Sequence, residues 1–270
     1  MDFKPIILVF DSGLGGLTVF REVAKARPDA NYVYAADDAF FPYGGHSETR
    51  LVGRVVPLMG ELIATHAPDL VVIACNTAST LVLPHLRARF AVPFVGTVPA
   101  IKPACMASRS RLVSVLGTDA TVRREYTRAL IRDFGQGCDV TLVGSGHLAG
   151  LAEAALHDAD TAIDDDVIAR EIAPCFVTAG DRRTDTIVLA CTHYPLLQDR
   201  LVRLASWPVD WIDPAPAIAR RVIDLVGPPP AGTSHSMAHA VFTSGLEPAP
   251  SLAATLMRFG IGRVGTNVTV

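Results

Sequence analysis

Short apolar runs that end in polar residues recur along this chain. The clearest two are DLVVIAC at residues 69–75 and DTIVLAC at residues 185–191. Each begins with an aspartate, ends in a cysteine six residues later, and is followed by two polar residues. A run of this kind predicts a strand that is buried on both faces of a parallel sheet. Because such sheets place their chemistry at the carboxyl ends of the strands, both cysteines are predicted at functional positions.

The same pattern predicts strands and helices in alternation. Further strands are expected at residues 6–10, 31–36, 93–97, 112–116, 140–143, 209–213 and 240–244. Helices are expected at residues 17–26, 47–67, 80–90, 198–205, 216–226 and 251–259. Two more are expected between them, one that begins at residue 151 and one that ends at residue 173. Pro57 is expected to kink or divide the second of these helices. Strands that alternate with helices predict an α/β fold with mostly parallel sheets.

The two halves of the chain resemble each other weakly. A polar turn follows an early strand in each half, at Asp11 and at Thr118, and a strand that ends in a cysteine comes later, at Cys75 and at Cys191. This repeat predicts two pseudo-symmetric α/β lobes. Repeated lobes commonly enclose a small ligand, so the active site is expected in the inter-lobe cleft.

The first turn, DSGLGG at residues 11–16, is rich in glycine. Glycines at a strand-to-helix turn allow a close approach of the backbone, and the N–H groups that open the helix favour an anion. A tight turn with a capping Asp or Ser is the simpler alternative. The spacing of Gly13, Gly15 and Gly16 differs from GxGxxG, so a dinucleotide site is not supported.

The residues after each cysteine suggest a reactive thiol. Asn76 and Thr77 follow Cys75 where the next helix begins, and helix N–H dipoles lower the pKa of a thiol from about 8.5 toward neutrality. Cys191 is followed by Thr192 and His193, and a histidine beside a thiol at a strand end predicts a partner that handles protons. The alternative for Cys75 is a buried structural cysteine.

Composition excludes several classes of protein. The 270 residues have room for two domains, and half of them are hydrophobic. The chain has 24 basic and 27 acidic residues without a basic stripe, so no nucleic-acid partner is expected. No apolar run reaches the roughly 18 residues that a membrane span needs. Five scattered cysteines without a CxxC pair argue against disulfides or structural zinc and favour the cytoplasm.

Two matched thiols suit one reaction in particular. Inversion at a carbon needs a base that removes a proton from one face and an acid that returns a proton to the other. Pyridoxal phosphate would need a Schiff-base lysine, and none of Lys4, Lys25 and Lys102 lies at a glycine-rich strand end. We therefore expect no cofactor, and no metal either, since no His/Cys/Asp cluster has ligand spacing. Exclusion of water and donors aimed at a carboxylate would have to stabilise the carbanion.

The ordered motifs FDSGLGG, PYGG, ACNTAS, GTDAT and ACTHYPLL resemble those of glutamate racemases in the aspartate/glutamate racemase superfamily. The resemblance runs from about residue 9 to residue 213, and the last 40 or so residues match poorly. Departures are residues 39–41 before PYGG and the pair Arg123 and Arg124 after GTDAT. The resemblance implies a first lobe of residues 1–97 plus 208–270, a second lobe of residues 98–207, and frequent homodimers.

The resemblance also implies an activity and roles for individual residues. The activity would be interconversion of L- and D-glutamate, with D-glutamate destined for peptidoglycan. Cys75 would act on the D-enantiomer and Cys191 on the L-enantiomer, assisted by Asp11, Glu153 and His193. Besides Asp11 and His193, the residues implied to hold the substrate are Ser12, Tyr43, Gly44, Asn76, Thr77, Thr118, Thr121 and Thr192.

Two alternatives stay open at this point. One is a related enzyme, either a racemase of aspartate or another amino acid, or a cis–trans isomerase of a diacid. The other is a two-lobed protein that binds a small anion and performs no chemistry. A substrate panel separates the enzymes, and a binding protein would show no proton exchange and would keep its ligand affinity in a Cys75→Ser variant.

Overall fold

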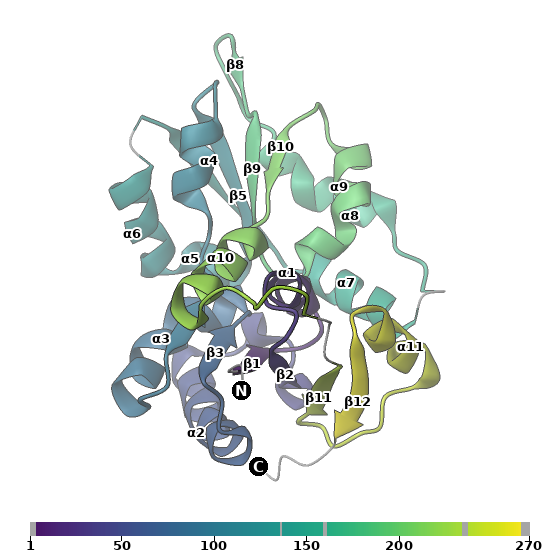
Figure 1. The fold of residues 1–270 in the computed structure, drawn as a ribbon. Coiled ribbons are helices and arrows are strands. Elements are labelled where there is room, and N and C mark those ends of the chain that lie inside the picture. The colour runs from purple at the N-terminus through teal and green to yellow at the C-terminus, as the bar shows by residue number, and fades with distance from the viewer. Residues whose placement is uncertain (1–3, 136, 159–160, 234–236, 266–270) are drawn as a thin grey trace.

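The computed structural model describes residues 4–135, 137–158, 161–233 and 237–265. Its larger sheets are both parallel, and each has helices on its two faces (Figure 1). The first sheet has the order β12 (Ile261–Gly265), β11 (Ala238–Phe242), β2 (Asn31–Ala36), β1 (Ile6–Asp11), β3 (Leu70–Ile73) and β4 (Phe94–Gly96). The second has the order β10 (Asp210–Ile212), β9 (Thr186–Ala190), β5 (Leu112–Thr118) and β6 (Asp139–Ser145). The predicted α/β class with mostly parallel sheets is confirmed.

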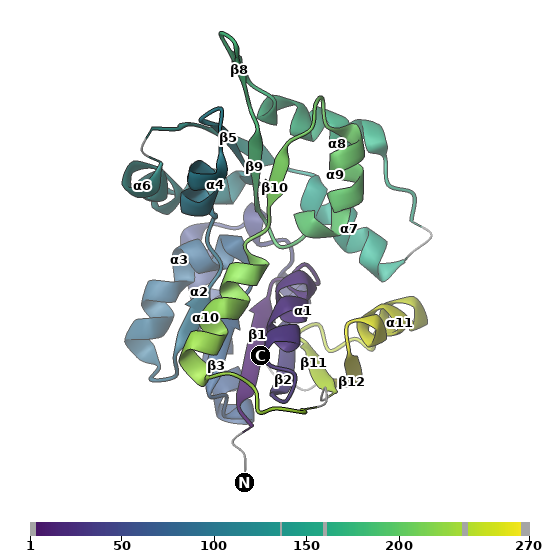
Figure 2. The ribbon, with the colours of Figure 1, turned by 45° about the horizontal axis from the view of Figure 1, so that its top comes forward.

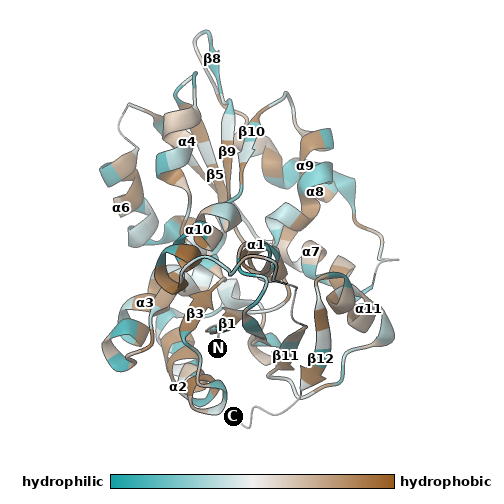
Figure 3. Ribbon diagram, viewed as in Figure 1, coloured by the Kyte–Doolittle hydropathy of each residue, from teal (hydrophilic) through white to brown (hydrophobic). Residues whose placement is uncertain are grey.

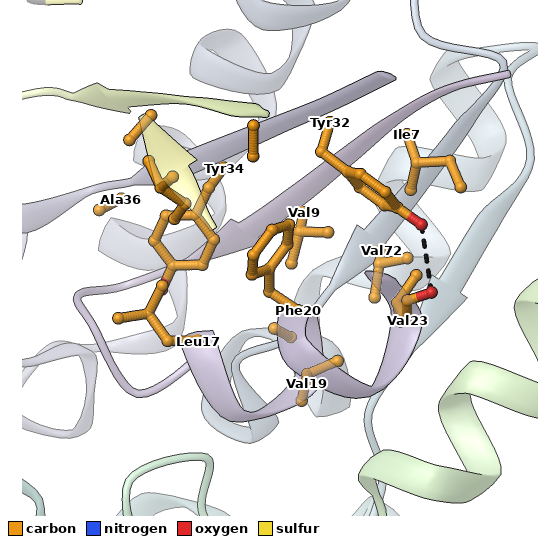
Figure 4. Close-up of a cluster of buried hydrophobic side chains, with 14 of the residues drawn as sticks. Ile7, Val9, Leu17, Val19, Phe20, Val23, Tyr32, Tyr34, Ala36 and Val72 are labelled. Atoms are coloured by element: carbon orange, nitrogen blue, oxygen red, sulfur yellow. Dashed lines mark hydrogen bonds between the residues drawn. The ribbon is translucent and has the colours of Figure 1, made fainter. Parts of the chain in front are cut away.

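The first sheet is covered on both faces, which explains its continuous apolar strands. In β1, Ile7 and Val9 face a cluster that includes residues of α1 (Leu17–Ala26), α10 (Ala215–Val226) and α11 (Pro250–Arg258). The alternate residues Leu8 and Phe10 face α2 (Glu48–His66) and α3 (Asn76–Arg89) on the other side. Figure 4 shows the first of these clusters, in which Phe20 of α1 packs edge-on against Tyr32, with ring centroids 5.4 Å apart.

The second sheet is also covered on both faces. A cluster with α4 (Ile101–Ala107) and α6 (Glu125–Phe134) covers one face, and one with α7 (Leu148–His157), α8 (Asp165–Ile172) and α9 (Gln198–Leu204) covers the other. The short helix α5 (Asp119–Arg123) follows β5. A small hairpin of β7 (Thr178–Ala179) and β8 (Arg182–Arg183) extends from the far end of this lobe (Figures 1 and 2). The apolar strands and inner helix faces are visible in Figure 3.

The repeat predicted from the sequence corresponds to matched strand pairs. β1, which ends at Asp11, pairs directly with β3, which leads to Cys75. In the second sheet β5, which ends at Thr118, pairs directly with β9, which leads to Cys191. Since the strands of each pair are parallel, each lobe presents a polar turn and a cysteine side by side at the carboxyl ends of its strands.

Some elements differ from the sequence prediction. α2 is one continuous helix with Pro57 inside it, so the proline does not divide it. α3 and α7 begin at Asn76 and Leu148, earlier than expected. Elements that were not predicted are α4, α5, α6, β12 and the β7–β8 hairpin.

The chain passes between the lobes twice. It leaves the first lobe after β4 and returns between β10 and α10, which Figure 2 shows lying beside α1. Because β10 pairs with β9, the return lies after Ile212, a few residues beyond the expected boundary at residue 208. The division into these two lobes remains our proposal. Residues 1–3, 136, 159–160, 234–236 and 266–270 of the expected lobes lie outside the described residues.

Membrane-spanning helices are not found in the described part of the chain, where no helix is both long and apolar enough.

Candidate active site

A small cavity lies where the carboxyl ends of both sheets face each other. The first lobe contributes residues that follow β1, β2 and β3, and the second contributes residues at the ends of β5 and β9 and in α7. The lining residues are Ser12, Phe41, Pro42, Tyr43, Gly44, Cys75, Asn76, Thr77, Thr118, Ala149, Cys191, Thr192 and His193. The cavity volume is about 30 Å³, which is room for very few water molecules.

Cys75 ends the cysteine strand of the first lobe and is the N-cap residue of α3. Its Sγ donates a hydrogen bond to Ser12 Oγ at 3.7 Å, and the residue is only 5% exposed. Burial, together with the nearby Asp11 carboxylate, raises the pKa of the Cys75 thiol to about 12. The expectation that helix dipoles lower this pKa is therefore wrong, because desolvation outweighs the backbone N–H of Ala78 and the Ser12 hydroxyl.

Cys191 has a different neighbour, the imidazole of His193. Its Sγ lies 3.7 Å from His193 Nδ1, and His193 Nε2 lies 2.6 Å from Glu153 Oε2. Burial disfavours a charged imidazole, but the hydrogen bonds to Cys191 and Glu153 prevail and raise the pKa of His193 well above its ordinary value. Despite its burial, the pKa of Glu153 falls to about 2 because His157, His193 and the Leu14 N–H stabilise the carboxylate. Cys191, His193 and Glu153 thus form one hydrogen-bonded chain.

The glycine-rich turn of the first lobe contacts this chain directly. Both Glu153 oxygens accept a hydrogen bond from the Leu14 N–H at 3.0 Å. A Cβ on Gly13 would lie 2.5 Å from Glu153 Oε1, and a Cβ on Gly15 would lie 2.4 Å from His193 Nδ1. The predicted anion at this turn is therefore a carboxylate of the same protein, and the glycines allow the two lobes to meet.

Asp11 lies behind the cavity wall and also joins the lobes. It is fully buried, and its carboxylate accepts hydrogen bonds from the Gly13 N–H at 3.1 Å and from the Thr192 hydroxyl at 3.3 Å. Burial raises the pKa of Asp11 to about 6, although the positive charge of His193 opposes that rise. Asp11 therefore places a titratable carboxyl group close to Cys75.

Hydroxyl and amide groups from both lobes also gather at the cavity. Thr77 from the first lobe lies 3.0 Å from Thr118 and 3.3 Å from Thr121, oxygen to oxygen, and Thr118 lies 2.9 Å from Thr121. Asn76 is 2% exposed, and both polar atoms of its side chain lack a hydrogen-bond partner within the described protein. A buried amide without a partner is costly, so Asn76 is suited to bind a polar ligand.

Tyr43 and Gly44 form the remaining wall together with residues that were not predicted. The Tyr43 hydroxyl donates to Asp37 Oδ2 at 2.7 Å, which directs it away from the cavity. Phe41 lies against His193, with ring centroids 5.6 Å apart. In the sequence, Phe41 stands out only because residues 39–41 depart from the family pattern. That departure does not indicate a contact with His193.

All sequence-predicted site residues therefore lie together. Most line the cavity, and Asp11, Thr121 and Glu153 stand directly behind residues that do. Within the described ranges, no group of three or more His, Cys, Asp or Glu side chains is arranged to hold a metal ion.

Comparisons with known proteins agree with this arrangement. Residues 15–222 match the family model of Asp/Glu/hydantoin racemases. The chain is 57% identical to the glutamate racemase of Brucella anthropi over 84% of this chain and 81% of that protein. It is 52% identical to the glutamate racemase of Sinorhizobium fredii over 97% and 96% of the two chains.

A solved structure extends the similarity to three dimensions. The crystal structure of Escherichia coli glutamate racemase, in complex with L-glutamate and the activator UDP-MurNAc-Ala, superposes with a TM-score of 0.86. The two chains are 39% identical, and the match covers 97% of each. The chain belongs to the Asp/Glu/hydantoin racemase family and, within it, to the glutamate racemases, which are amino-acid isomerases.

Proposed function

We propose that this protein interconverts L- and D-glutamate by direct proton transfer at the α-carbon, with Cys75 and Cys191 as the two acid/base groups. The observation that carries the proposal is that one thiol from each lobe lines a single small cavity. Two thiols that reach one cavity from different lobes suit a reaction that exchanges protons on opposite faces of one carbon. The relatives named above supply the choice of glutamate as substrate.

The proposed reaction proceeds in two proton transfers. With L-glutamate bound, a thiolate at Cys191 removes the α-proton and becomes a thiol, while the electron pair stays on the α-carbon and its carboxylate. The Cys75 thiol then delivers its proton to the other face and becomes a thiolate, which completes inversion to D-glutamate. The reverse reaction uses the same two groups in exchanged roles, so protons and charge balance in both directions.

The groups beside the two thiols fit these two roles, proton removal by Cys191 and proton delivery by Cys75. The raised pKa of His193 favours its protonated form, so a negative charge formed on Cys191 during proton transfer would have a positive neighbour. Cys75 has the Asp11 carboxyl group nearby and a raised pKa, so it retains its proton until substrate binds.

The hydrogen-bonding groups of the cavity would hold the two carboxylates of the substrate and stabilise the carbanion. Asn76 offers an unpartnered amide, and the cluster of Thr77, Thr118 and Thr121 offers hydroxyls from both lobes. Thr192 and Ser12, together with the wall formed by Tyr43 and Gly44, complete the proposed substrate contacts. Most of the side chains that line the cavity are buried, so a substrate held there would be shielded from water, which strengthens every such interaction.

The wider role of the enzyme follows from family membership. We propose that it acts in the cytoplasm as a homodimer and supplies D-glutamate for peptidoglycan synthesis. Sedimentation of the purified protein would test the dimer, and rescue of a D-glutamate-requiring bacterium would test the supply role.

Proton NMR in deuterated water tests the proposed reaction directly. Each glutamate enantiomer is incubated separately with purified enzyme and no added cofactor, and circular dichroism follows the inversion. We expect loss of the α-proton signal from both enantiomers together with inversion. Cys75→Ser and Cys191→Ser should each lower kcat by at least about 100-fold, since proton transfer by a positioned group contributes at least that factor.

The same experiment separates the alternatives. Inversion of aspartate but not of glutamate would assign a different amino-acid substrate to the site. Absence of exchange with glutamate, aspartate and maleate would contradict a racemase and support a binding protein.

A further inference from the structure

Asp37 is a buried carboxylate beside the site that the proposed reaction does not use. It directly follows β2, is completely buried, and donates its backbone N–H to the carbonyl of Asp11 at 2.9 Å. A carboxylate removed from water is stable only where charged or hydrogen-bonding partners surround it. Its partners therefore indicate what it holds in place.

Three side chains from three separate segments donate hydrogen bonds to Asp37. Arg54 of α2 donates from Nη2 at 2.6 Å and from Nε at 3.1 Å. Tyr43 donates its hydroxyl at 2.7 Å, and Thr243, which follows β11, does the same at 2.7 Å. The carboxylate thus joins α2, the cavity wall and the residues from β11 onward, which we call the C-terminal segment.

The C-terminal segment also holds the residues next to Asp37. The Thr243 N–H donates to the carbonyl of Ala36 at 3.1 Å, and its hydroxyl oxygen accepts from the Ala39 N–H at 3.3 Å. The Ser244 N–H donates to Asp38 Oδ1 at 2.9 Å. Residues 37–39, which lead into the cavity wall, are therefore also held by the residues that follow β11.

Tyr43 transmits this arrangement to the cavity. Its side chain is 1% exposed and packs in the core cluster that includes Leu51, Val55 and Cys75. The hydroxyl is bound by Asp37 while the residue lines the cavity, so a single hydrogen bond connects Asp37 to this wall.

We propose that Asp37 is a positioning residue for the racemase reaction, acting through Tyr43 to hold residues 41–44 at the cavity, with Arg54 and Thr243 as its other anchors. The kinetic part of this inference rests on the proposed function. It gives the C-terminal segment, which matches the family pattern poorly, a role in shaping the site.

The test compares Asp37→Asn with Asp29→Asn. Asp29 is a matched control because it is also buried and paired with an arginine, Arg27, at 2.9 Å, but lies ahead of β2 and away from the cavity. We expect Asp37→Asn to raise the KM for glutamate roughly tenfold or more, as displaced binding groups do, with the pH profile of kcat unchanged. Asp29→Asn should lower thermal stability without changing KM.

Milder variants keep the test valid if Asp37→Asn does not fold. Tyr43→Phe and Thr243→Val each remove one hydroxyl and leave the Asp37–Arg54 ion pair in place. Each should raise KM severalfold, and the double variant should show less than the product of the two effects, because both act on one carboxylate. Fully independent effects on KM would contradict a shared action through Asp37.

Alkylation of Cys75 provides a readout that does not depend on the substrate. A displaced wall exposes Cys75, so iodoacetamide should modify it several times faster in Asp37→Asn than in Asp29→Asn, with the buried Cys175 as internal reference. Equal KM values and equal Cys75 rates in the two variants would overturn the inference. If the wild type does not invert glutamate, the proposed function fails, and the alkylation rates alone decide about Asp37.

Discussion

At the scale of single residues, charge distinguishes the two cysteines. Both are almost fully buried, but Cys75 has a carboxyl group, Asp11, among its neighbours, whereas Cys191 has the protonated imidazole of His193. His193 follows Cys191 by two residues in the chain, whereas Asp11 belongs to a different strand from the one that leads to Cys75, so the asymmetry combines one local contact with one long-range contact. Asp11 is therefore the residue whose replacement should make the two thiols more alike.

Replacement of Asp11 by Asn tests that view. Removal of the negative charge should lower the pKa of Cys75 from about 12, while burial keeps it above its ordinary value. At a fixed pH below the pKa of Cys75, alkylation of this thiol should become roughly tenfold faster. A tenfold change corresponds to about 1.4 kcal/mol less cost of forming the thiolate. The pH dependence of alkylation, read by peptide mapping, is the measurement.

Cys175 is the internal control for this experiment. Burial alone raises its pKa to about 12, so its alkylation should not respond to Asp11→Asn. An unchanged Cys75 rate, or an equal change at both cysteines, would contradict the assigned influence of Asp11.

Sequence motifs identified the residues close to the cysteines and, through the family resemblance, the assisting Asp11 and Glu153, but they did not identify Asp37 or Phe41 as part of the site. Asn76, Thr192 and His193 adjoin a cysteine in the chain, so the strand-end argument includes them. The contact from Thr243 to Asp37 spans 206 residues. No local pattern signals such a contact, so Asp37 and Phe41 became visible only in three dimensions.

At the scale of elements, the glycine-rich turn before α1 is a contact surface between the lobes. Gly15 does not have a positive φ angle, so an alanine would suit the backbone there. The conflict is with the neighbour, because the new Cβ would overlap the ring of His193. Close approach of the second lobe, rather than backbone conformation, requires glycine at this position.

Gly15→Ala should therefore impair catalysis more than folding. Displacement of His193 by about 1 Å should lower kcat/KM by roughly 100-fold. The control is Gly53→Ala in α2, where a Cβ meets nothing within 4 Å. That variant should stabilise the protein by about 0.5–1 kcal/mol and leave kcat/KM unchanged. Steady-state kinetics and thermal unfolding measure both, and full activity in Gly15→Ala would contradict the contact.

Element prediction succeeded where both faces of a strand are buried and failed where the pattern is weak. β1, β3 and β9 read as continuous apolar runs because helices cover both sides of their sheets. Among the described residues β12 pairs with β11 alone, and its residues Gly262 and Arg263 are exposed, so its sequence lacks such a run. α4 was not predicted, although Pro103 lies in its first turn, where a proline is tolerated.

At the scale of the whole molecule, a buried carboxylate links the two lobes. Glu153 belongs to the second lobe and accepts from Leu14 in the first, and its pKa of about 2 lies below the ordinary 4.5. A lowered carboxyl pKa contributes stability above pH 4.5, and this contribution is lost as the pH falls toward 2. The difference between the two pKa values of Glu153 corresponds to roughly 3 kcal/mol of stability.

Asp11 acts with the opposite sign. Its raised pKa contributes stability at low pH, and this contribution is lost as the pH rises through about 6.

Acid unfolding should reveal the Glu153 contribution. Between pH 6 and pH 3 the pH dependence of stability should differ between the wild type and Glu153→Gln: below pH 4.5 only the wild type loses the Glu153 contribution, whereas the variant lacks the carboxylate that keeps buried His193 protonated. Glu125→Gln serves as the control, because that exposed ion pair with Arg132 contributes little. Urea unfolding at each pH is the measurement, and parallel pH curves for wild type and Glu153→Gln would contradict the role of Glu153.

The contact between Thr243 and Asp37 also has a consequence for how the protein is made. Synthesis proceeds from the N-terminus, so Cys75 and Cys191 both leave the ribosome before Thr243 does. The second lobe, from β5 to β10, is continuous and can be completed while α10 and β11 of the first lobe are still missing. A nascent chain would therefore hold both thiols well before the wall that contains Tyr43 has its last anchor. Catalytic activity should be among the last properties that the growing chain acquires.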